Sequence, residues 1–382
     1  MTTQRIGIVF YGATGELAAR QHLPALTAIR DEGGLPLADG TKLIPDVVLV
    51  GRDPAKLEVV SATTGFIRRT TDLDAALAST SETVFFDAAP SGLRVDAVTR
   101  AIAAHKHVYC EKPVAGTVKA AIALQTAANA AGIMAGTVQD KLFLPGFEAL
   151  LGLRRSGFFG QILELRLEMG RWIFDGFEQN GQRPSWNYRK ADGGGLILDM
   201  FPHWRYMIDA LAGPMHAVTA THRTHIPRRR DERGADYDVD VEDSVFAQFE
   251  LDGGAIASVN SSWCTRARRE FAIQIQIDGT EGSAVAGPFA CWKQAKSEAP
   301  GGPIASAVPS SASFFDGWTA VPVNRTPTNS YRAGWELFLR HVAEDGPMPY
   351  TLLQGAKGVQ LAELAYLSAR ERRWVDIPTL KA

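Results

Sequence analysis

The sequence predicts an α/β protein in two parts: an N-terminal doubly wound domain with a parallel sheet, and a C-terminal α+β domain with a large, open, mostly antiparallel sheet. Continuous apolar strands alternate with helical segments as far as about residue 140. Beyond that point, long segments alternate apolar and polar residues, as half-buried antiparallel strands do. A chain of 382 residues can form two cores. We therefore expect domains at residues 1–140 and 141–382.

Composition narrows the class of protein. Apolar residues make up 46% of the chain and charged residues 21%, which is ordinary for a soluble globular protein. The formal net charge of −2 gives no reason to expect nucleic acid or an anionic membrane as a partner. Three cysteines form neither a disulfide framework nor a metal-binding pattern, and no signal peptide or membrane-length apolar run is present. We expect a cytoplasmic protein without a bound metal.

The first strand leads into a glycine turn. Arg5–Tyr11 is a continuous apolar run, and a helix is predicted from Glu16 to about Arg30. A turn between a strand and a helix directs backbone N–H groups and the helix N-terminus at a phosphate. The fingerprint G-x-G-x-x-G is absent, but small residues stand where the backbone must turn. We expect dinucleotide phosphates to bind at Gly12, Ala13, Thr14, Gly15 and Glu16.

The end of the second strand, residues 46–50, bears on cofactor choice. In an NAD-selective site an acidic side chain here binds the ribose 2′-hydroxyl. This chain has Gly51 followed by Arg52, which would leave room for a 2′-phosphate and pair with it. The sequence therefore favours NADP(H). In the alternative, Arg52 points to solvent and Asp53 binds the ribose of NAD(H).

A lysine follows a later strand of the same domain. The run 108–110 is a short strand, and Glu111-Lys112-Pro113 ends it abruptly. The carboxyl end of a strand in an open α/β sheet is where such proteins place their chemistry. The alternative is a surface charge pair before a loop proline. The rest of this domain is predicted as helices at 72–78, 93–104 and 117–131, and strands at 83–88 and 133–138.

The second domain is predicted to contain one helix near 146–155 and strands at 161–169, 216–225, 244–251, 255–263 and 270–278. The exposed face of such a sheet would normally be covered by another subunit, which predicts a homo-oligomer, a dimer or a tetramer. Two C-terminal helices, near 331–344 and 353–370, are expected to pack back on the first domain.

An acid and a histidine follow a run of three glycines in the second domain. Pro202 predicts the first turn of a helix, with Asp199 just before it and His203 on the same side. A carboxylate beside a histidine can orient the ring. In the alternative, Asp199 caps the helix and His203 is packed in place. The glycines favour a functional role, because such flexibility is costly unless the backbone must approach something closely.

Together these motifs resemble the Gfo/Idh/MocA family of oxidoreductases, named after glucose–fructose oxidoreductase and inositol 2-dehydrogenase. The resemblance covers nearly the whole chain, and Glu111-Lys112-Pro113 with Gly193-Gly194-Gly195-x-x-x-Asp199-x-x-x-His203 carry it. It implies an N-terminal Rossmann domain and an open C-terminal sheet used for oligomerisation. It also implies a cis Lys112–Pro113 bond and a catalytic set of Lys112, Asp199 and His203. Pro90, Glu111 and Lys112 join Arg52 and the glycine turn as expected cofactor contacts.

The chain departs from the family pattern in three places. The first turn is Gly-Ala-Thr-Gly, the segment after Pro90 lacks a frequent histidine, and Gln139-Asp140-Lys141 replaces an Asn-x-Arg element. The last change predicts a substrate other than inositol or simple glucose. Flat aromatic faces and hydrogen-bond donors suit a polyol. The expected substrate contacts are Gln139, Lys141, Trp172, Arg183, Trp186, Tyr188, Asp199, His203 and Trp204.

The predicted reaction is hydride transfer between a nicotinamide and a secondary alcohol or ketone of a sugar, sugar derivative or cyclitol. His203 would act as acid and base with Asp199 orienting it, and Lys112 would polarise the substrate oxygen. One alternative is glycoside cleavage or epimerisation with a retained NAD, and another is reduction of a non-sugar carbonyl. A non-enzymatic dinucleotide sensor is a third, but it would not need the lysine and the histidine together.

Overall fold

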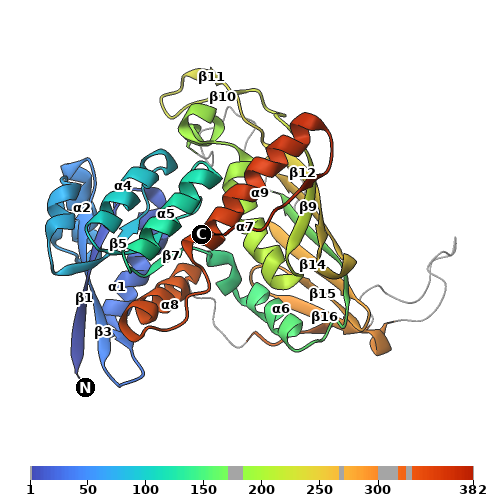
Figure 1. Cartoon of the computed structure of the whole chain (residues 1–382), viewed down its shortest axis with the longest axis horizontal. Helices are drawn as coiled ribbons and strands as arrows, with labels where there is room; N and C mark the ends of the chain where they lie inside the picture. Colours follow the sequence, from blue (N-terminus) through green and yellow to red (C-terminus); the bar gives the residue numbers. More distant parts are fainter. Residues whose placement is uncertain (1, 171–183, 266–270, 300–316, 324–328, 382) are drawn as a thin grey trace. The chain divides into compact units, whose positions relative to one another are not determined.

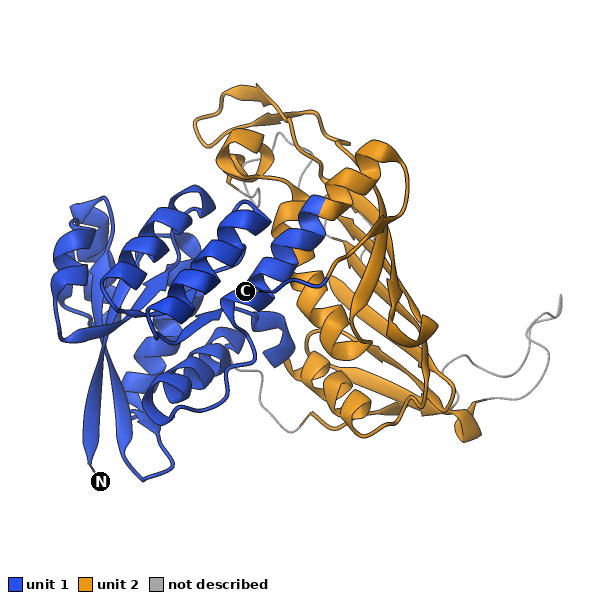
Figure 2. Ribbon diagram, viewed as in Figure 1, with its two compact units in different colours: residues 1–143, 328–363, 379–382 blue, residues 144–327, 364–378 orange. Residues whose placement is uncertain are grey.

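The structure is a computed structural model that describes residues 2–170, 184–265, 271–299, 317–323 and 329–381. The chain divides into two compact units (Figure 2). Unit 1 comprises residues 1–143, 328–363 and 379–382, and unit 2 comprises residues 144–327 and 364–378. Residues 328–363, from the region of the two C-terminal helices expected to pack back on the first domain, belong to the first unit. No helix in the described part of the chain is long and apolar enough to span a membrane.

Unit 1 contains a seven-stranded sheet in the order β2-β3-β1-β5-β6-β7, with β4 paired to β3. All pairs are parallel except β2 with β3, so the predicted doubly wound parallel sheet is confirmed. The short strands β2 and β4 were not predicted. The strands are β1 (Thr3–Tyr11), β2 (Leu35–Pro36), β3 (Lys42–Val50), β4 (Arg68–Thr70), β5 (Glu82–Asp87), β6 (His107–Cys110) and β7 (Ala135–Thr137).

Helices cover both faces of this sheet (Figure 1). One face packs against α1, α2 and α8, and the other against α3, α4, α5 and the start of α9. A π-helical stretch, η1 (Ala18–His22), leads directly into α1. The helices are α1 (Leu23–Asp31), α2 (Pro54–Thr64), α3 (Leu73–Ala78), α4 (Ser91–Ala103), α5 (Val118–Ala130), α8 (Ser330–Glu344) and α9 (Leu352–Glu371).

Unit 2 contains a nine-stranded sheet in the order β17-β16-β15-β14-β8-β13-β12-β9-β18. Most pairs are antiparallel, but β8, which we expected to be antiparallel, pairs parallel with β13 and antiparallel with β14. The strands are β8 (Ile162–Gly170), β9 (Met215–Arg223), β12 (Ser244–Leu251), β13 (Ile256–Ser262), β14 (Ile273–Gly279), β15 (Gly282–Ala286), β16 (Cys291–Ala295), β17 (Thr319–Ala320) and β18 (Val375–Asp376).

One face of this sheet carries α6 (Pro145–Arg155) and α7 (Leu196–Leu211). In β12 the residues Val245, Ala247 and Phe249 are buried toward the helices, and the alternate residues are exposed. Phe201 of α7 packs edge-on against Phe249, which seats this helix on the sheet. The sheet therefore has one covered and one open face, as its alternating sequence predicted.

Candidate active site

The carboxyl ends of four strands, β1, β5, β6 and β7, meet at one edge of unit 1. The backbone N–H of Ala88 donates to the carbonyl of Tyr11, and that of Glu111 donates to the carbonyl of Asp87. The backbone N–H of Val138, just after β7, donates to the carbonyl of Cys110 at the end of β6. The glycine turn, the loop at Pro90, Lys112 and the segment after β7 therefore lie along one edge, as the parallel order requires.

The turn after β1 fits the phosphates of a dinucleotide. Gly12 has a φ of 81°, and a Cβ atom there would lie 2.5 Å from the backbone nitrogen of Ala89. A Cβ atom on Gly15 would lie 3.2 Å from the carbonyl oxygen of Gly12, so it would crowd the turn. Thr14 and Gly15 are partly exposed, and the helix begins directly after them. A bare backbone turn at a helix N-terminus is a suitable cradle for an anionic phosphate.

The end of β3 carries the residues that distinguish the two cofactor alternatives, Gly51, Arg52 and Asp53. Asp53 caps α2, because its carboxylate accepts the backbone N–H groups of Ala55 at 3.0 Å and Lys56 at 3.2 Å. Its position is therefore explained by the helix start. Gly51 is buried, and a Cβ atom there would lie 3.2 Å from the side chain of Leu57, so an acidic side chain would not fit without rearrangement. Arg52 is exposed.

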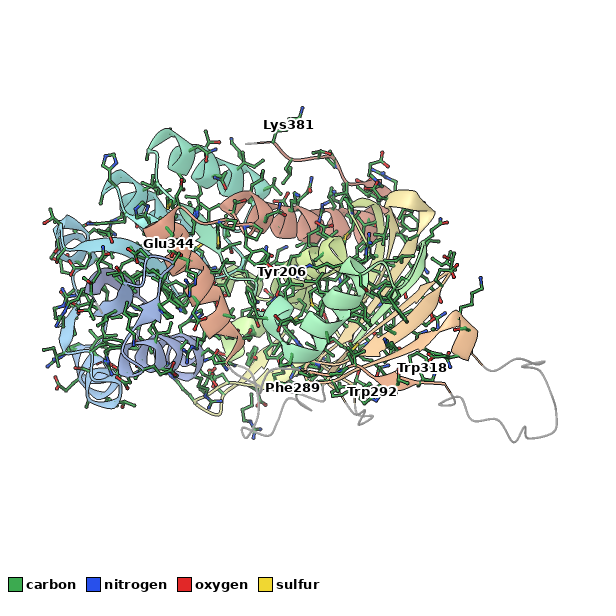
Figure 3. The ribbon with its side chains drawn as sticks, turned by 90° about the horizontal axis from the view of Figure 1, so that it is seen from below. Tyr206, Phe289, Trp292, Trp318, Glu344 and Lys381 are labelled. Atoms are coloured by element: carbon green, nitrogen blue, oxygen red, sulfur yellow. The ribbon has the colours of Figure 1, made fainter. Side chains whose placement is uncertain are left out.

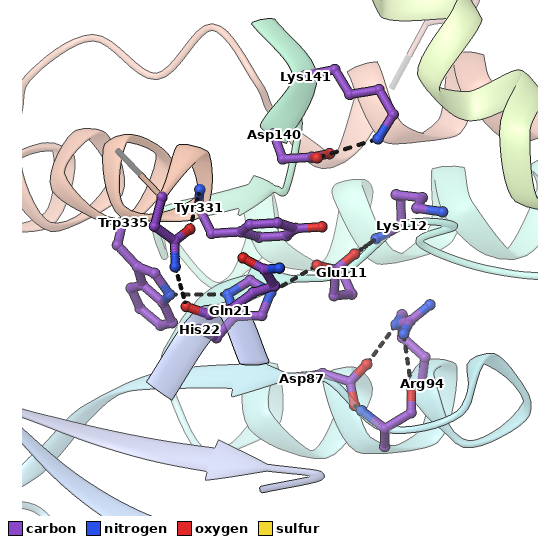
Figure 4. Close-up of polar contacts among 12 residues, drawn as sticks. Gln21, His22, Asp87, Arg94, Glu111, Lys112, Asp140, Lys141, Tyr331 and Trp335 are labelled. Carbon is purple, nitrogen blue, oxygen red and sulfur yellow. Dashed lines mark hydrogen bonds and ion pairs between the residues drawn. The ribbon is translucent and has the colours of Figure 1, made fainter. Parts of the chain in front are cut away.

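Lys112 stands just after β6, and its bond to Pro113 is cis, as the resemblance implied. The neighbouring Glu111 is only 3% exposed. Its carboxylate accepts the backbone N–H of Lys112 at 3.0 Å and lies 2.8 Å from Nε2 of His22 (Figure 4). Both carboxylate oxygens thus face protein partners. The expected contact of Glu111 with the cofactor remains a prediction.

Burial alone would raise the pKa of Glu111, but its partners outweigh that effect. The hydrogen bond with His22, together with the charges of Lys112 and Arg94, holds the pKa of Glu111 below its ordinary value. The carboxylate is therefore ionised inside unit 1.

A buried arginine ties two of the strand-end loops together. Arg94 of α4 pairs with Asp87 at the end of β5, and both side chains are nearly inaccessible. The same guanidinium donates to the carbonyl of Ala89 at 2.9 Å and to the carbonyl of Pro113 at 2.5 Å. The loop that carries Pro90 and the loop that carries Lys112 are thus held by one cation. Such a pair is costly to break, because removal of one partner leaves a buried charge.

The segment after β7 begins the 3-10 helix η2 (Asp140–Phe143). Gln139 is 4% exposed, and Lys141 pairs with Asp140 at 3.3 Å. Lys141 retains partial exposure. Of the two substrate contacts expected here, Lys141 is therefore the more accessible.

In unit 2, helix α7 begins earlier than predicted. It runs from Leu196, so Pro202 lies inside it and Asp199 lies in its first turn. Proline lacks an N–H, so the carbonyl of Leu198 loses its usual helical partner, but the helix continues. The prediction that the helix starts at Pro202 was wrong. Asp199 and His203 nevertheless remain four residues apart on one side of a helix.

The start of α7 is set by a residue from a distant part of the chain. Glu242 accepts the backbone N–H of Ile197 at 2.7 Å, and the hydroxyl of Tyr366 donates to the same carboxylate oxygen at 2.9 Å. A Cβ atom on Gly195 would lie 2.9 Å from that oxygen, and one on Gly194 would lie 2.5 Å from the carbonyl oxygen of Asn187. Two of the three glycines are thus explained by close packing inside unit 2. Glu242, rather than Asp199, supplies the capping carboxylate.

His203 has a partner that the sequence analysis did not identify. Its Nδ1 atom lies 2.8 Å from the hydroxyl of Tyr206, one turn further along α7. His203 is 4% exposed and Tyr206 is 7% exposed (Tyr206 is labelled in Figure 3). The spacing of three residues could have indicated this contact, because such residues are neighbours on a helix. Asp199 is partly buried on the same side.

Two comparisons with protein families cover most of the chain. Residues 5–138 match the oxidoreductase family with an NAD-binding Rossmann fold, and residues 147–285 match the GFO/IDH/MocA C-terminal domain. The D-xylose dehydrogenase of Paenarthrobacter nicotinovorans is 42% identical, over 99% of both chains. The chain belongs to the Gfo/Idh/MocA family of oxidoreductases. The predicted resemblance is confirmed.

More distant members of the Gfo/Idh/MocA family share the fold. The levoglucosan dehydrogenase of Pseudarthrobacter phenanthrenivorans is 25% identical over 83% of this chain and 86% of its own. A solved structure of a levoglucosan dehydrogenase in complex with NADH and levoglucosan superposes with a TM-score of 0.83. It covers 98% of this chain and all of its own at 21% identity, which supports the fold alone.

The aromatic residues of this chain that we expected to contact the substrate differ in their exposure. Trp204 and Tyr188 have no exposed surface; the Trp204 indole donates to Ser261, and the Tyr188 ring packs against Trp263. These two predictions were wrong, because both side chains belong to the core of unit 2. Trp186 is 41% exposed and can contact a ligand. Trp172 and Arg183 lie outside the described residues. Among the described residues, no cluster of histidine, cysteine or acidic side chains forms a metal site.

Proposed function

We propose that this protein is an NAD(P)-dependent sugar dehydrogenase that takes a hydride from a CH–OH carbon of its substrate. The observation that carries the proposal is Lys112 at the carboxyl edge of the parallel sheet, beside a bare glycine turn that suits a dinucleotide phosphate. The 42% identity to a D-xylose dehydrogenase over 99% of both chains supports a sugar as the substrate.

Four residues have separate tasks in the proposed reaction. A bound nicotinamide supplies the hydride acceptor at its C4 carbon. Lys112 donates to the substrate oxygen and stabilises the negative charge that develops there. His203 removes the hydroxyl proton as the hydride leaves carbon. Asp199 helps to orient His203, and the Tyr206 hydroxyl at Nδ1 directs the other ring nitrogen, Nε2, toward proton exchange.

The proposed cofactor is NADP(H), with NAD(H) as the alternative. Asp53 is used as a helix cap, and the position of the usual ribose-binding acid is occupied by the buried Gly51. The exposed Arg52 is suitably charged for a 2′-phosphate. Solved structures of levoglucosan dehydrogenase in complex with NADH support the alternative, NAD(H), and initial rates with each dinucleotide distinguish the two.

The proposed substrate class is a ring-form aldose, with D-xylose as the first candidate. Its hemiacetal carbon is a CH–OH group, and loss of a hydride and a proton from it gives a lactone. Oxidation at any other ring carbon gives a keto sugar instead. Lactone and keto products can be separated chemically, so the oxidised position follows directly from the product.

The protein is proposed to act in the cytoplasm as a homo-oligomer. All three cysteines are unpaired, as in a reducing compartment. The open face of the unit 2 sheet exposes Phe246 by 51% and Ile256 by 52% on neighbouring strands. Large exposed apolar side chains on a sheet favour burial against a second copy.

The test is a cofactor-reduction screen with NAD and NADP across aldoses, anhydrosugars and cyclitols. We expect absorbance of the reduced nicotinamide to appear with an aldose, and a Lys112→Met variant to lose this activity. The protein could instead retain a nicotinamide cofactor through purification and convert sugars without net cofactor reduction. That result would favour epimerisation or glycoside cleavage. Undiminished activity in Lys112→Met would refute the catalytic assignment.

A further inference from the structure

Three buried polar side chains of unit 1 form a chain that ends at the backbone of Lys112. The indole N–H of Trp335 in α8 donates to Nδ1 of His22 at 3.1 Å. Nε2 of His22 lies 2.8 Å from one oxygen of Glu111, and the other oxygen accepts the N–H of Lys112 at 3.0 Å. Figure 4 shows the three contacts in sequence. The four residues come from the π-helical stretch, the end of β6 and a helix from the C-terminal part of the chain.

The indole determines which ring nitrogen of His22 can donate. A tryptophan N–H can only donate a hydrogen bond, so Nδ1 of His22 accepts it through its lone pair. The ring proton then stands on Nε2, which donates a hydrogen bond to the Glu111 carboxylate. A proton on Nδ1 as well would place two N–H donors opposite each other. In this arrangement His22 is a hydrogen-bond donor to Glu111.

The surroundings make this donor important for Glu111. His22 has no exposed surface, and its ring lies 4.5 Å from the ring of Phe86 and 4.7 Å from that of Tyr331. A carboxylate in such an apolar place is strongly destabilised unless hydrogen-bond donors satisfy it. His22 is the last residue of the π-helical stretch Ala18–His22, which leads directly into α1.

We propose that His22 is a positioning residue for Lys112, acting through Glu111, with Trp335 holding it in the donor tautomer. The Glu111 carboxylate, oriented by His22, holds the backbone N–H of Lys112. This contact fixes the backbone of the residue whose side chain reaches the substrate. The ammonium group can then meet the substrate oxygen without prior ordering of the loop. This inference rests on the proposed catalytic function of Lys112.

The first experiment compares His22→Leu with His22→Gln, using kcat, the KM for the sugar and the Kd for the dinucleotide. We expect His22→Leu to lower kcat by about 100-fold, as displacements of about 1 Å at a reacting group do. The Kd for the dinucleotide should stay within about threefold, since Glu111 faces the protein interior. In His22→Gln an amide N–H can replace the Nε2 donor, so most of kcat should return. The matched control is His216→Leu, which removes an exposed histidine that also pairs with an acid, Asp252.

The second experiment does not depend on the folding of a variant. In the wild-type protein labelled with ¹⁵N-histidine, one ring should show a bare Nδ1 and a protonated Nε2 at neutral pH. The Trp335→Phe variant removes the indole donor and should lose this signature. A doubly protonated ring or an Nδ1–H tautomer at His22 would overturn the inference. An unchanged kcat in a folded His22→Leu protein would also overturn the inference, provided that Lys112→Met is inactive. If Lys112→Met is active, the proposed function is overturned instead.

Discussion

The hydroxyl of Tyr206 lies 2.8 Å from Nδ1 of His203, and both side chains are buried in unit 2. The contact joins two residues one turn apart on α7, so the helix itself holds their geometry. It gives the candidate acid–base residue a neutral hydrogen-bond partner.

Tyr206→Phe should lower kcat by about fivefold, because one neutral hydrogen bond contributes about 1 kcal/mol. Steady-state kinetics measures this effect. Tyr237→Phe is the control, because among the described residues the Tyr237 hydroxyl has no hydrogen-bond partner. An unchanged kcat in Tyr206→Phe would exclude a role of this contact in catalysis.

Lys112→Met should lower kcat by about 100-fold or more, the usual effect of removing a group that stabilises developing charge. The Kd for the dinucleotide should change little, because methionine keeps most of the side-chain volume. Fluorescence titration and single-turnover kinetics separate the two quantities. Lys119→Met, at an exposed position on α5, serves as the control. A loss confined to dinucleotide binding would assign Lys112 to the cofactor alone.

Arg52→Ala should raise the KM for NADP by about 10–100-fold, the range expected for a hydrogen bond to a charged group. The KM for NAD should stay nearly constant, because NAD has no 2′-phosphate. The comparison needs only initial rates with each dinucleotide. Arg69→Ala, another surface arginine, is the control. A wild-type protein that prefers NAD would contradict the proposed role of Arg52.

Burial raises the pKa of Glu242, although the N–H of Ile197 opposes this effect. The folded protein then binds this proton more tightly than the unfolded chain, so the contribution of Glu242 to stability is greatest at low pH. It declines as pH rises through the interval between the ordinary and the raised pKa. Glu242→Gln keeps an acceptor for the N–H and removes the titration.

The difference in Tm between wild type and Glu242→Gln should therefore shift in favour of the variant as the pH rises above the ordinary carboxyl pKa. Thermal melts followed by circular dichroism at several pH values measure it. A constant difference at all pH values would mean that Glu242 has no raised pKa in the folded protein.

Much of the fold could be predicted because its signals are local. The apolar run before Gly12 is a buried parallel strand, and the alternation around Phe249 is a half-buried one. The very short strands β2 and β4 gave no comparable pattern, since two or three residues show no periodicity. The start of α7 was misplaced because its capping carboxylate, Glu242, stands 45 residues away from Ile197.

The site was predictable to the same extent. The sequence alone determined that Lys112 follows a strand of a parallel sheet and that Asp199 and His203 share one side of a helix, because backbone pattern and residue spacing encode both. Only the tertiary structure decided that Glu111 turns inward to His22 and that the Trp335 indole donates to Nδ1 of that ring. Those contacts depend on a helix from the C-terminal part of the chain returning to unit 1, and no local pattern specifies which distant donor will meet a buried carboxylate.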